Sequence, residues 1–244
     1  MTASLDTPLT SEAGARAFWL AVTDTQPRRE PGDDAVALQP RQGDAFLQFR
    51  VVEHPPPRVH LCIHVDDVAS EVAHARSLGA RLIAQQHPRT LLASPGGFRF
   101  GVTSVRGERR RPPPVEAPEG RSLVDQICID VHPMLFEPEA AFWSALTGWE
   151  RRPARLAEFE YLDRPPGIPL RVLIQRLDDG PQKPVSAHLD FACDDVEAVV
   201  GRHQSLAAIV VRRTPYWTTM RDPAGREYCL TARDPDTGEL GTHR

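Results

Sequence analysis

The stretch AHLDFACDDVEAVVGRHQSLAAIVV, residues 187–211, repeats VHLCIHVDDVASEVAHARSLGARLI, residues 59–83, without a gap. His60 matches His188, at an offset of 188 − 60 = 128 residues. Each stretch begins as an alternating strand, continues through an Asp-Asp pair suited to cap a helix, and then becomes helical. Such internal similarity predicts two copies of one folding unit.

Two further landmarks support the duplication. SPGGFRFGV, from Ser94, matches DPAGREYCL, from Asp222, at 222 − 94 = 128 residues. ARAFWLAV matches EAAFWSAL and places Phe18 on Phe142, at 142 − 18 = 124 residues. The order of the landmarks is the same in both copies. We therefore expect the four-residue discrepancy to be a difference in loop length.

The second copy has the clearer pattern of elements. QICIDVH, residues 126–132, alternates as a half-buried strand does. FEPEAAFWSALTGWE, residues 136–150, has helical spacing, with acidic residues near its start and Gly148 near its end. Strands are expected in EFEYL, LRVLIQRL, SAHLDFAC, AIVVRR, YWTTM and REYCLTA. The first copy follows the same order, except that residues 1–9 show no alternation, so its first strand is expected to be missing or degenerate.

Residues 106–122, RGERRRPPPVEAPEGRS, are charged and proline-rich, which is typical of an extended, exposed linker. The predicted organisation is a first domain over residues 10–105, a linker over 106–121 and a second domain over 122–234.

Composition excludes several classes of protein. The chain has 244 residues, of which 41% are hydrophobic and 25% charged, as in a soluble globular protein. A net charge of −4 lacks the excess of basic residues that is typical of nucleic-acid binding. No apolar run approaches the ~20 residues of a membrane span. The N-terminus lacks a signal-peptide pattern, and the four cysteines form no CxxC pair. We expect reduced thiols and a cytoplasmic protein.

AAFWSALTGWE, HLDFACDDVEAVV and WTTMRDPAGREYCL, with HLCIHVDDV in the first copy, resemble the vicinal-oxygen-chelate superfamily of glyoxalases, bleomycin-resistance proteins and dioxygenases. The resemblance implies an α+β fold with tandem βαβββ modules paired into two open-barrel domains. It also implies a small-molecule ligand in a cleft, and a homodimer is possible.

Strand parity predicts which side chains face that cleft, because alternate residues point to opposite faces. Ile127, Ile129 and Val131 share the apolar face of the first strand, so its polar face carries Gln126, Cys128 and Asp130. By the same rule, His188 and Asp190 share one face of their strand, and Glu227 and Cys229 share one face of theirs. We expect these polar faces to line one concave wall.

The resemblance implies a divalent metal such as Mn, Fe, Ni or Zn, held by inward-facing side chains. His188 occupies a ligand position of the family, and Gln126 falls near another. Cys229 stands where metal-binding members have glutamate, with Glu227 two residues earlier, and the remaining ligand position falls on Leu173 or Gln175. The predicted set of His188, Glu227 and Gln126 is therefore incomplete by the standard of the family.

The first copy departs further. His60 keeps its ligand position, with Cys62 and His64 on the same face, but Arg99 replaces Glu227 and Gly101 replaces Cys229. A cation at that point repels a metal ion. The first copy is therefore expected to hold no metal.

Two functions remain open at this point. The first is binding of a small organic molecule in the cleft of the second domain, where the expected ligand contacts are Gln126, Asp190, Gln175, Tyr216, Trp217 and Cys229. The alternative is a metal-dependent lyase, isomerase or extradiol-type dioxygenase, with His188 and Glu227 as catalytic residues. His188 is also open to a purely structural, hydrogen-bonded role.

Overall fold

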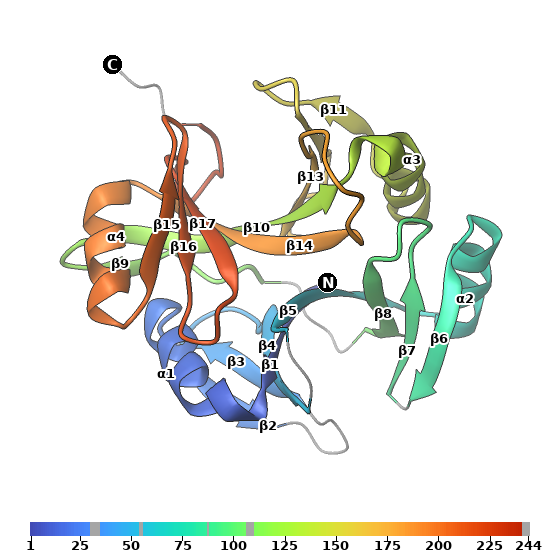
Figure 1. Cartoon of the computed structure of the whole chain (residues 1–244). Coiled ribbons are helices and arrows are strands. Elements are labelled where there is room, and N and C mark those ends of the chain that lie inside the picture. The colour runs from blue at the N-terminus through green and yellow to red at the C-terminus, as the bar shows by residue number, and fades with distance from the viewer. Residues whose placement is uncertain (30–34, 54–55, 87, 106–109, 241–244) are drawn as a thin grey trace.

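Figure 1 shows the computed structural model, which describes residues 1–29, 35–53, 56–86, 88–105 and 110–240. Each copy forms its own curved sheet, in the order β2-β3-β4-β1-β5-β8-β7-β6 for the first and β11-β12-β13-β10-β14-β17-β16-β15 for the second. The elements of the first copy are β1 (Thr2–Pro8), α1 (Glu12–Val22), β2 (Thr25–Arg29), β3 (Val36–Pro40), β4 (Leu47–Val52), β5 (Arg58–Val65), α2 (Val68–Ser77), β6 (Arg81–Gln86), β7 (Arg89–Ala93) and β8 (Arg99–Ser104). Those of the second are β9 (Val115–Ala117), β10 (Gly120–Val131), α3 (Phe136–Thr147), β11 (Arg151–Pro153), β12 (Phe159–Leu162), β13 (Arg171–Arg176), β14 (Ser186–Cys193), α4 (Val196–Ser205), β15 (Ile209–Arg213), β16 (Trp217–Arg221) and β17 (Glu227–Thr231).

The predicted α+β fold of paired βαβββ modules is confirmed. In each copy two modules meet through antiparallel strands, β1 with β5 and β10 with β14. Ser4 pairs with His60, and Cys128 pairs with His188. The loop between β13 and β14 has nine residues, 177–185, whereas that between β4 and β5 has five, 53–57. This loop accounts for the predicted four-residue difference, since 9 − 5 = 4.

Of the two expectations for the first strand of the first copy, that it is missing or that it is degenerate, the first is wrong. Residues 2–8 form β1, which pairs with β4 and β5, and all seven residues are buried. Ala3 and Leu5 lie in the core, while Thr2, Ser4 and Asp6 alternate with them on the opposite face. The core face carries only two apolar side chains, one of them small, followed by the polar Thr7, so the sequence has too little contrast to reveal the strand.

The two copies share one hydrophobic core, because each contributes a helix to the other. In Figure 1, α1 lies beside the elements of the second copy around α4, and α3 lies beside α2 and β8 of the first. The Trp19 ring stacks on Phe191 with centroids 6.0 Å apart. In the reciprocal position, Trp143 meets Phe100 edge-on at 5.2 Å. Both tryptophans are fully buried, as expected for core residues.

Buried carboxylates hold these crossed helices in place. The Trp19 indole donates to Asp222 Oδ2 at 2.8 Å, in the DPAG turn of the second copy. The matching turn of the first copy has Ser94 in place of that aspartate. There Glu139, on α3, accepts from both the Trp143 indole at 2.9 Å and the Gly96 amide at 2.8 Å. The second copy thus supplies from its helix the carboxylate that the first copy lacks in its turn.

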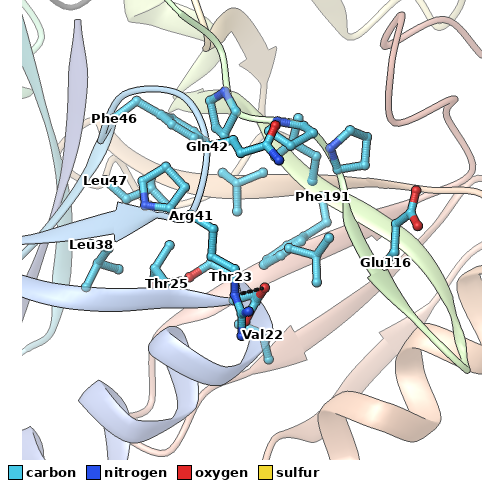
Figure 2. A pocket seen from close by; sticks show the side chains of 18 residues that line it. Val22, Thr23, Thr25, Leu38, Arg41, Gln42, Phe46, Leu47, Glu116 and Phe191 are labelled. Carbon is cyan, nitrogen blue, oxygen red and sulfur yellow. Dashed lines mark hydrogen bonds and ion pairs between the residues drawn. The ribbon is translucent and has the colours of Figure 1, made fainter.

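The described part of the predicted linker contacts both copies. Residues 106–109, including most of the arginine-rich run, lie outside the described residues. Arg110 and Asp44 exchange two hydrogen bonds, at 2.7 and 2.8 Å, and Val115–Ala117 forms β9 on the edge of β10. Pro112, Pro113 and Pro114 also line a cavity of about 370 Å³ between the copies, with Leu38 and Phe191 in its apolar wall (Figure 2). We propose that the boundary between the copies lies between β8 and β9.

Among the described residues, no helix has the length and apolar character that crossing a bilayer requires.

Folding stability is expected to fall below neutral pH because of His203. This residue is fully buried on α4, and its Nδ1 lies 2.9 Å from the Tyr228 hydroxyl. Burial, and secondarily the charge of Arg202, lowers the pKa of His203 to about 3. Below pH ~6.5 the unfolded chain therefore binds a proton at His203 that the folded chain does not bind. At pH 5 this costs about 2 kcal/mol, since each pKa unit is worth roughly 1.4 kcal/mol.

Urea unfolding of the wild type and of His203→Gln at pH 7 and pH 5 measures this effect. The glutamine keeps a partner for Tyr228 but does not titrate, so the wild type is expected to lose about 2 kcal/mol more than the variant between the two pH values. Equal losses would show that His203 does not set the acid sensitivity.

Candidate functional site

A cavity of about 800 Å³ occupies the concave side of the second sheet. Its floor follows the predicted parity. Ile127, Ile129 and Val131 of β10 are fully buried in the core, and Gln126, Cys128 and Asp130 line the cavity. On β14, His188 and Asp190 line it, whereas Leu189 is in the core. The alternation rule therefore places the polar residues of the second copy on one hollow wall, as predicted.

All the residues predicted as a site line this one cavity: Gln126, Gln175, His188, Asp190, Tyr216, Trp217, Glu227 and Cys229. They do not all come together. Gln126, His188 and Asp190 make direct contact on the floor. Glu227 is about half exposed, and its carboxylate pairs with Arg221 at 2.7 Å. The charge of Glu227 is thus already compensated by Arg221, and its role as ligand or base stays a prediction.

His188 lies between two carboxylates. Its Nδ1 is 2.9 Å from Asp130 Oδ2, and its Nε2 is 3.3 Å from Asp190 Oδ1. Burial lowers the pKa of His188, but Asp130, with smaller effects from Cys128, Cys229 and Asp190, raises it by more, to well above the usual value. Asp130 was not among the predicted site residues. Its parity placed it in the cleft, but only the structure brings its carboxylate to the imidazole.

A hydrogen-bonded chain continues from Asp190 along the floor. The Gln126 amide nitrogen donates to Asp190 Oδ2, and the Gln126 oxygen accepts from Arg233 at 3.1 Å. Arg233 also binds Asp125 through two bonds, of 2.5 and 3.0 Å, and both residues are buried. Because Arg233 occupies the oxygen of Gln126, the amide must turn its nitrogen to Asp190. Gln126 therefore orients Asp190, whereas the sequence predicted it as a metal ligand.

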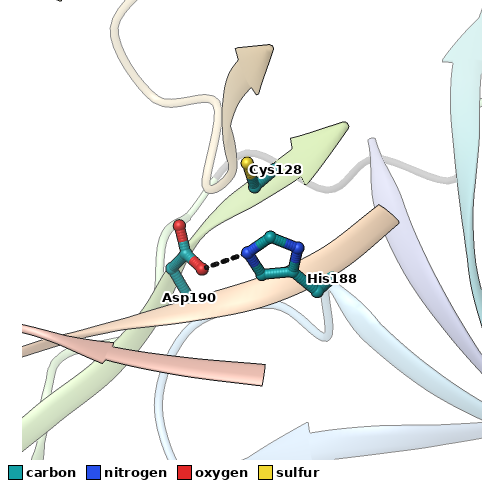
Figure 3. Close-up of side chains that lie close together, drawn as sticks. All are labelled: Cys128, His188 and Asp190. Atoms are coloured by element: carbon teal, nitrogen blue, oxygen red, sulfur yellow. Dashed lines mark ion pairs between the residues drawn. The ribbon is translucent and has the colours of Figure 1, made fainter. Parts of the chain in front are cut away.

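One group that could hold a metal ion occurs among the described residues: Cys128, His188 and Asp190 (Figure 3). Their ligand atoms all lie within 4.8 Å of one another. Asp190 Oδ1 is buried and makes no hydrogen bond, and its one charged neighbour is His188 Nε2 at 3.3 Å. A metal ion would sit between these two atoms in place of the proton on Nε2. His188 Nδ1 is held by Asp130, the carboxylate–histidine arrangement that usually orients a ligating imidazole. One thiol, one imidazole and one carboxylate suit a borderline ion such as Zn²⁺. These residues therefore fit a metal.

Cys128 and Cys229 are both buried near the imidazole of His188. Burial raises the pKa of the Cys128 thiol. Cys229, in the position where the family resemblance implies glutamate, contacts the Thr219 hydroxyl through its sulfur at 3.7 Å. Neither thiol was predicted as a metal ligand, because the family resemblance implies a set of His, Gln and Glu.

Aromatic rings enclose the cavity from above the floor. Phe159 of β12 meets Trp217 of β16 edge-on, with centroids 5.8 Å apart. Tyr216 stacks on Trp217 at 6.4 Å, and the guanidinium of Arg155 lies 5.7 Å from the Tyr216 ring. Phe159 joins Trp217 in a wall that an apolar or aromatic ligand can contact.

The first copy keeps one feature of this site. His60 Nδ1 lies 2.9 Å from Asp6 Oδ2, as His188 does from Asp130. Burial raises the pKa of Asp6, but its hydrogen bond and ion pair with His60 lower it by more. Cys62 takes the place of Asp190, and in the described part of the chain no metal-binding group forms there. The histidine–aspartate pair is duplicated, whereas the cation site is not.

Comparison with known proteins agrees with this architecture. The model of a family described as a glyoxalase-like domain matches residues 5–103 and 126–231. No curated protein matched the chain by sequence.

Solved structures resemble the whole chain at low identity. The Mn(II)-bound glyoxalase from Novosphingobium aromaticivorans has a TM-score of 0.66 at 17% identity, covering 99% of this chain and 85% of that one. A variant of 4-hydroxymandelate synthase from Streptomyces coelicolor has a TM-score of 0.60 at 16% identity, covering 98% of this chain and 95% of that one. A variant of homoprotocatechuate 2,3-dioxygenase from Brevibacterium fuscum has a TM-score of 0.60 at 14% identity, covering 98% of this chain and 74% of that one. The likeness is one of fold.

Proposed function

This chain belongs to the glyoxalase-like domain family, and we propose that it binds a small organic molecule in the cleft of its second copy. The observation that carries the proposal is the 800 Å³ cavity, which joins a polar floor to an aromatic wall. Ligand sites commonly have this size and this combination of apolar lining with a few fixed polar groups. Gln175, Tyr216 and Trp217 would contact the ligand, while His188 and Asp190 would recognise its polar atoms.

Thermal unfolding with a library of aromatic and oxygen-rich compounds tests this function. A compound that binds the folded chain at 100 times its Kd stabilises it by about 2.7 kcal/mol and raises the Tm. We expect such shifts for some members of the library, without turnover if binding is the whole function. A library that leaves the Tm unchanged throughout would rule the proposal out.

The cation site favours a second candidate, a metal-dependent lyase, isomerase or dioxygenase. Cys128 Sγ, His188 Nε2 and Asp190 Oδ1 would hold the ion. A bound metal would supply Lewis-acid polarisation of substrate oxygens. Asp130 would fix the ring of His188, and Gln126 would leave Asp190 Oδ1 free by binding the other oxygen. Mn, Fe, Ni and Zn all remain possible, and the thiol favours the softer ions.

Metal content should depend on His188 and not on His60. We expect near-stoichiometric metal, measured by inductively coupled plasma mass spectrometry, in protein purified without a chelating tag. His188→Ala should lower it at least tenfold, because the imidazole nitrogen and its orientation by Asp130 are lost together.

His60→Ala is the matched control. It removes from the first copy a histidine whose Nδ1 lies as far from an aspartate oxygen as that of His188 does. Equal metal in the two variants would contradict the assignment of the site. Activity in wild-type protein free of metal would remove the metal-dependent candidate and leave the binding function standing.

A further inference from the structure

The cleft is rich in cations although the protein is acidic. The chain has a net charge of −4, yet the cavity is lined by seven Lys and Arg and by three Asp and Glu. Two of the seven cations, Arg226 and Arg233, are buried in ion pairs with aspartate. Within the described residues, five have no acidic group in ion-pair range: Arg58, Arg155, Arg171, Lys183 and Arg212.

Arg171 differs from the other four because it is not exposed. It lies on β13 with its Cα in register with that of Gln126 on β10, and it lines the cavity. Its guanidinium lies 5.8 Å from the centroid of Tyr161, and no side chain or backbone group of the described chain forms a hydrogen bond with it. A guanidinium carries five donors, and partial burial leaves fewer of them to water. Arg171 therefore presents a half-buried guanidinium, without a hydrogen-bond partner in the described chain, to the cavity.

Other arginines near Arg171 add to the positive potential at this end of the cavity. Arg111, Arg164 and Arg233 lie close enough to Asp125 to interact with it electrostatically, as Arg171 does. Beyond them, Asp236 pairs with Arg121 at 2.7 Å, and Asp234 lies beside Arg111. Around Asp125, four arginines (Arg111, Arg164, Arg171 and Arg233) thus meet two aspartates, Asp125 itself and Asp190. Burial, followed by repulsion from the neighbouring arginines against the attraction of Asp125, lowers the pKa of Arg164 to about 10.

The C-terminal segment closes this end of the cleft. Gly238 has a φ of +73° and packs so closely that an added Cβ would lie 2.9 Å from Asp125 Oδ2 and 3.0 Å from Arg171 Nη2. Arg233 pairs with Leu240 in an isolated bridge, and both residues line the cavity. An anion beside Arg171 would therefore be partly shielded from water, which strengthens its attraction to a guanidinium.

We propose that the ligand of the second-copy cleft carries an acid group, a carboxylate or a phosphate monoester, and that Arg171 binds it. This inference rests on the proposed small-molecule function. Arg171 and Asp190 flank Gln126 in one row across three strands, so their backbones lie about 10 Å apart at 4.8 Å per strand spacing. An acid group at Arg171 thus stays clear of the carboxylates around His188. The body of a monocyclic aromatic acid would reach from Arg171 toward the floor. Arginine suits either acid, because its planar fork matches both geometries.

Four fluorinated probes of similar size separate charge from shape: 4-fluorobenzoate, 4-fluorophenyl phosphate, 4-fluorobenzyl alcohol and 4-fluorobenzylamine. Their Kd values are measured by ¹⁹F NMR against the full-length protein. We expect at least one of the two acids to bind tenfold or more tightly than the alcohol, and the amine to bind more weakly still. The better acid identifies the anion class.

Arg171→Gln should reduce the preference for the acid over the alcohol to within twofold and leave alcohol binding unchanged, which also reports that the fold is intact. Arg171→Lys should keep part of the preference, since it retains the charge without the fork. Arg213→Gln, on an exposed arginine paired with Glu197, is the control and should change nothing.

Equal binding of acids and alcohol by the wild type would overturn the anion proposal and leave the proposed function standing. A preference that survives Arg171→Gln would overturn the role of Arg171. Failure of all four probes to bind would count against both proposals.

Discussion

Residues 122–244, expressed without the first copy, are expected to show no cooperative unfolding transition. In the full chain, α1 covers the core of the second copy with Phe18 and Trp19, which contact Phe191, His203 and Tyr228. The fragment would expose that core and would leave α3 with its aromatic face uncovered. Buried Arg226 would also lose the two partners that it has in β1, the Asp6 carbonyl and the Thr7 hydroxyl. The free energy lost with these core contacts would exceed the usual folding stability of a domain.

Circular dichroism during thermal unfolding of the fragment measures this. Co-expression of residues 1–121 is the control, and it should restore a cooperative transition if the copies complete each other. Trp19→Ala in the full chain should lose about 3–5 kcal/mol, as buried Trp truncations do. A fragment that unfolds cooperatively on its own would show that the first copy is only a cover.

Asp125→Ala is expected to cost about 3–5 kcal/mol of unfolding free energy, the loss typical when one partner of a buried ion pair is removed. Asp125 and Arg233 are both buried and share two hydrogen bonds. Without the carboxylate, Arg233 remains buried beside Arg171 with its charge uncompensated. The floor should change as well, because Arg233 holds the Gln126 amide that orients Asp190.

Chemical denaturation of Asp125→Ala and Glu197→Ala compares a buried pair with an exposed one. Glu197 pairs with Arg213 at the surface, where ion pairs contribute little, so its variant should unfold like the wild type. A similarly small effect at Asp125 would mean that the buried pair does not organise the floor of the cleft.

The fold could be predicted where the sequence repeats or alternates strongly. The match of His60 to His188 located equivalent strands in both copies, and the residual four-residue offset corresponds to the longer loop before β14. β1 escaped prediction because its polar face is buried, so burial and polarity do not alternate together. The crossing of α1 and α3 between the copies is a long-range packing choice, and no local pattern in either helix reveals it.

The sequence predicted which side chains line the wall of the site, but not which of them form hydrogen bonds and ion pairs with one another. Parity placed Gln126, His188 and Asp190 on one face, since side-chain direction follows from strand geometry. Whether two such side chains meet depends on rotamers and on partners from elsewhere in the chain. Glu227 has the right parity yet pairs with Arg221, and Arg233, beyond the last strand, turns Gln126 toward Asp190. The two contacts of Gln126 connect residues 64 and 107 positions apart, so they carry no local signal.

The claim that the second-copy cleft is the ligand site is tested most directly by filling it. Leu173 lies in register with Cys128 and Tyr161 and lines the cavity, so Leu173→Trp should occupy the space above the floor. Compounds that raise the Tm of the wild type are then measured against this variant at the same concentrations. We predict that their shifts disappear in Leu173→Trp while its own unfolding stays cooperative. Shifts of equal size in both proteins would place the ligand elsewhere and contradict the account.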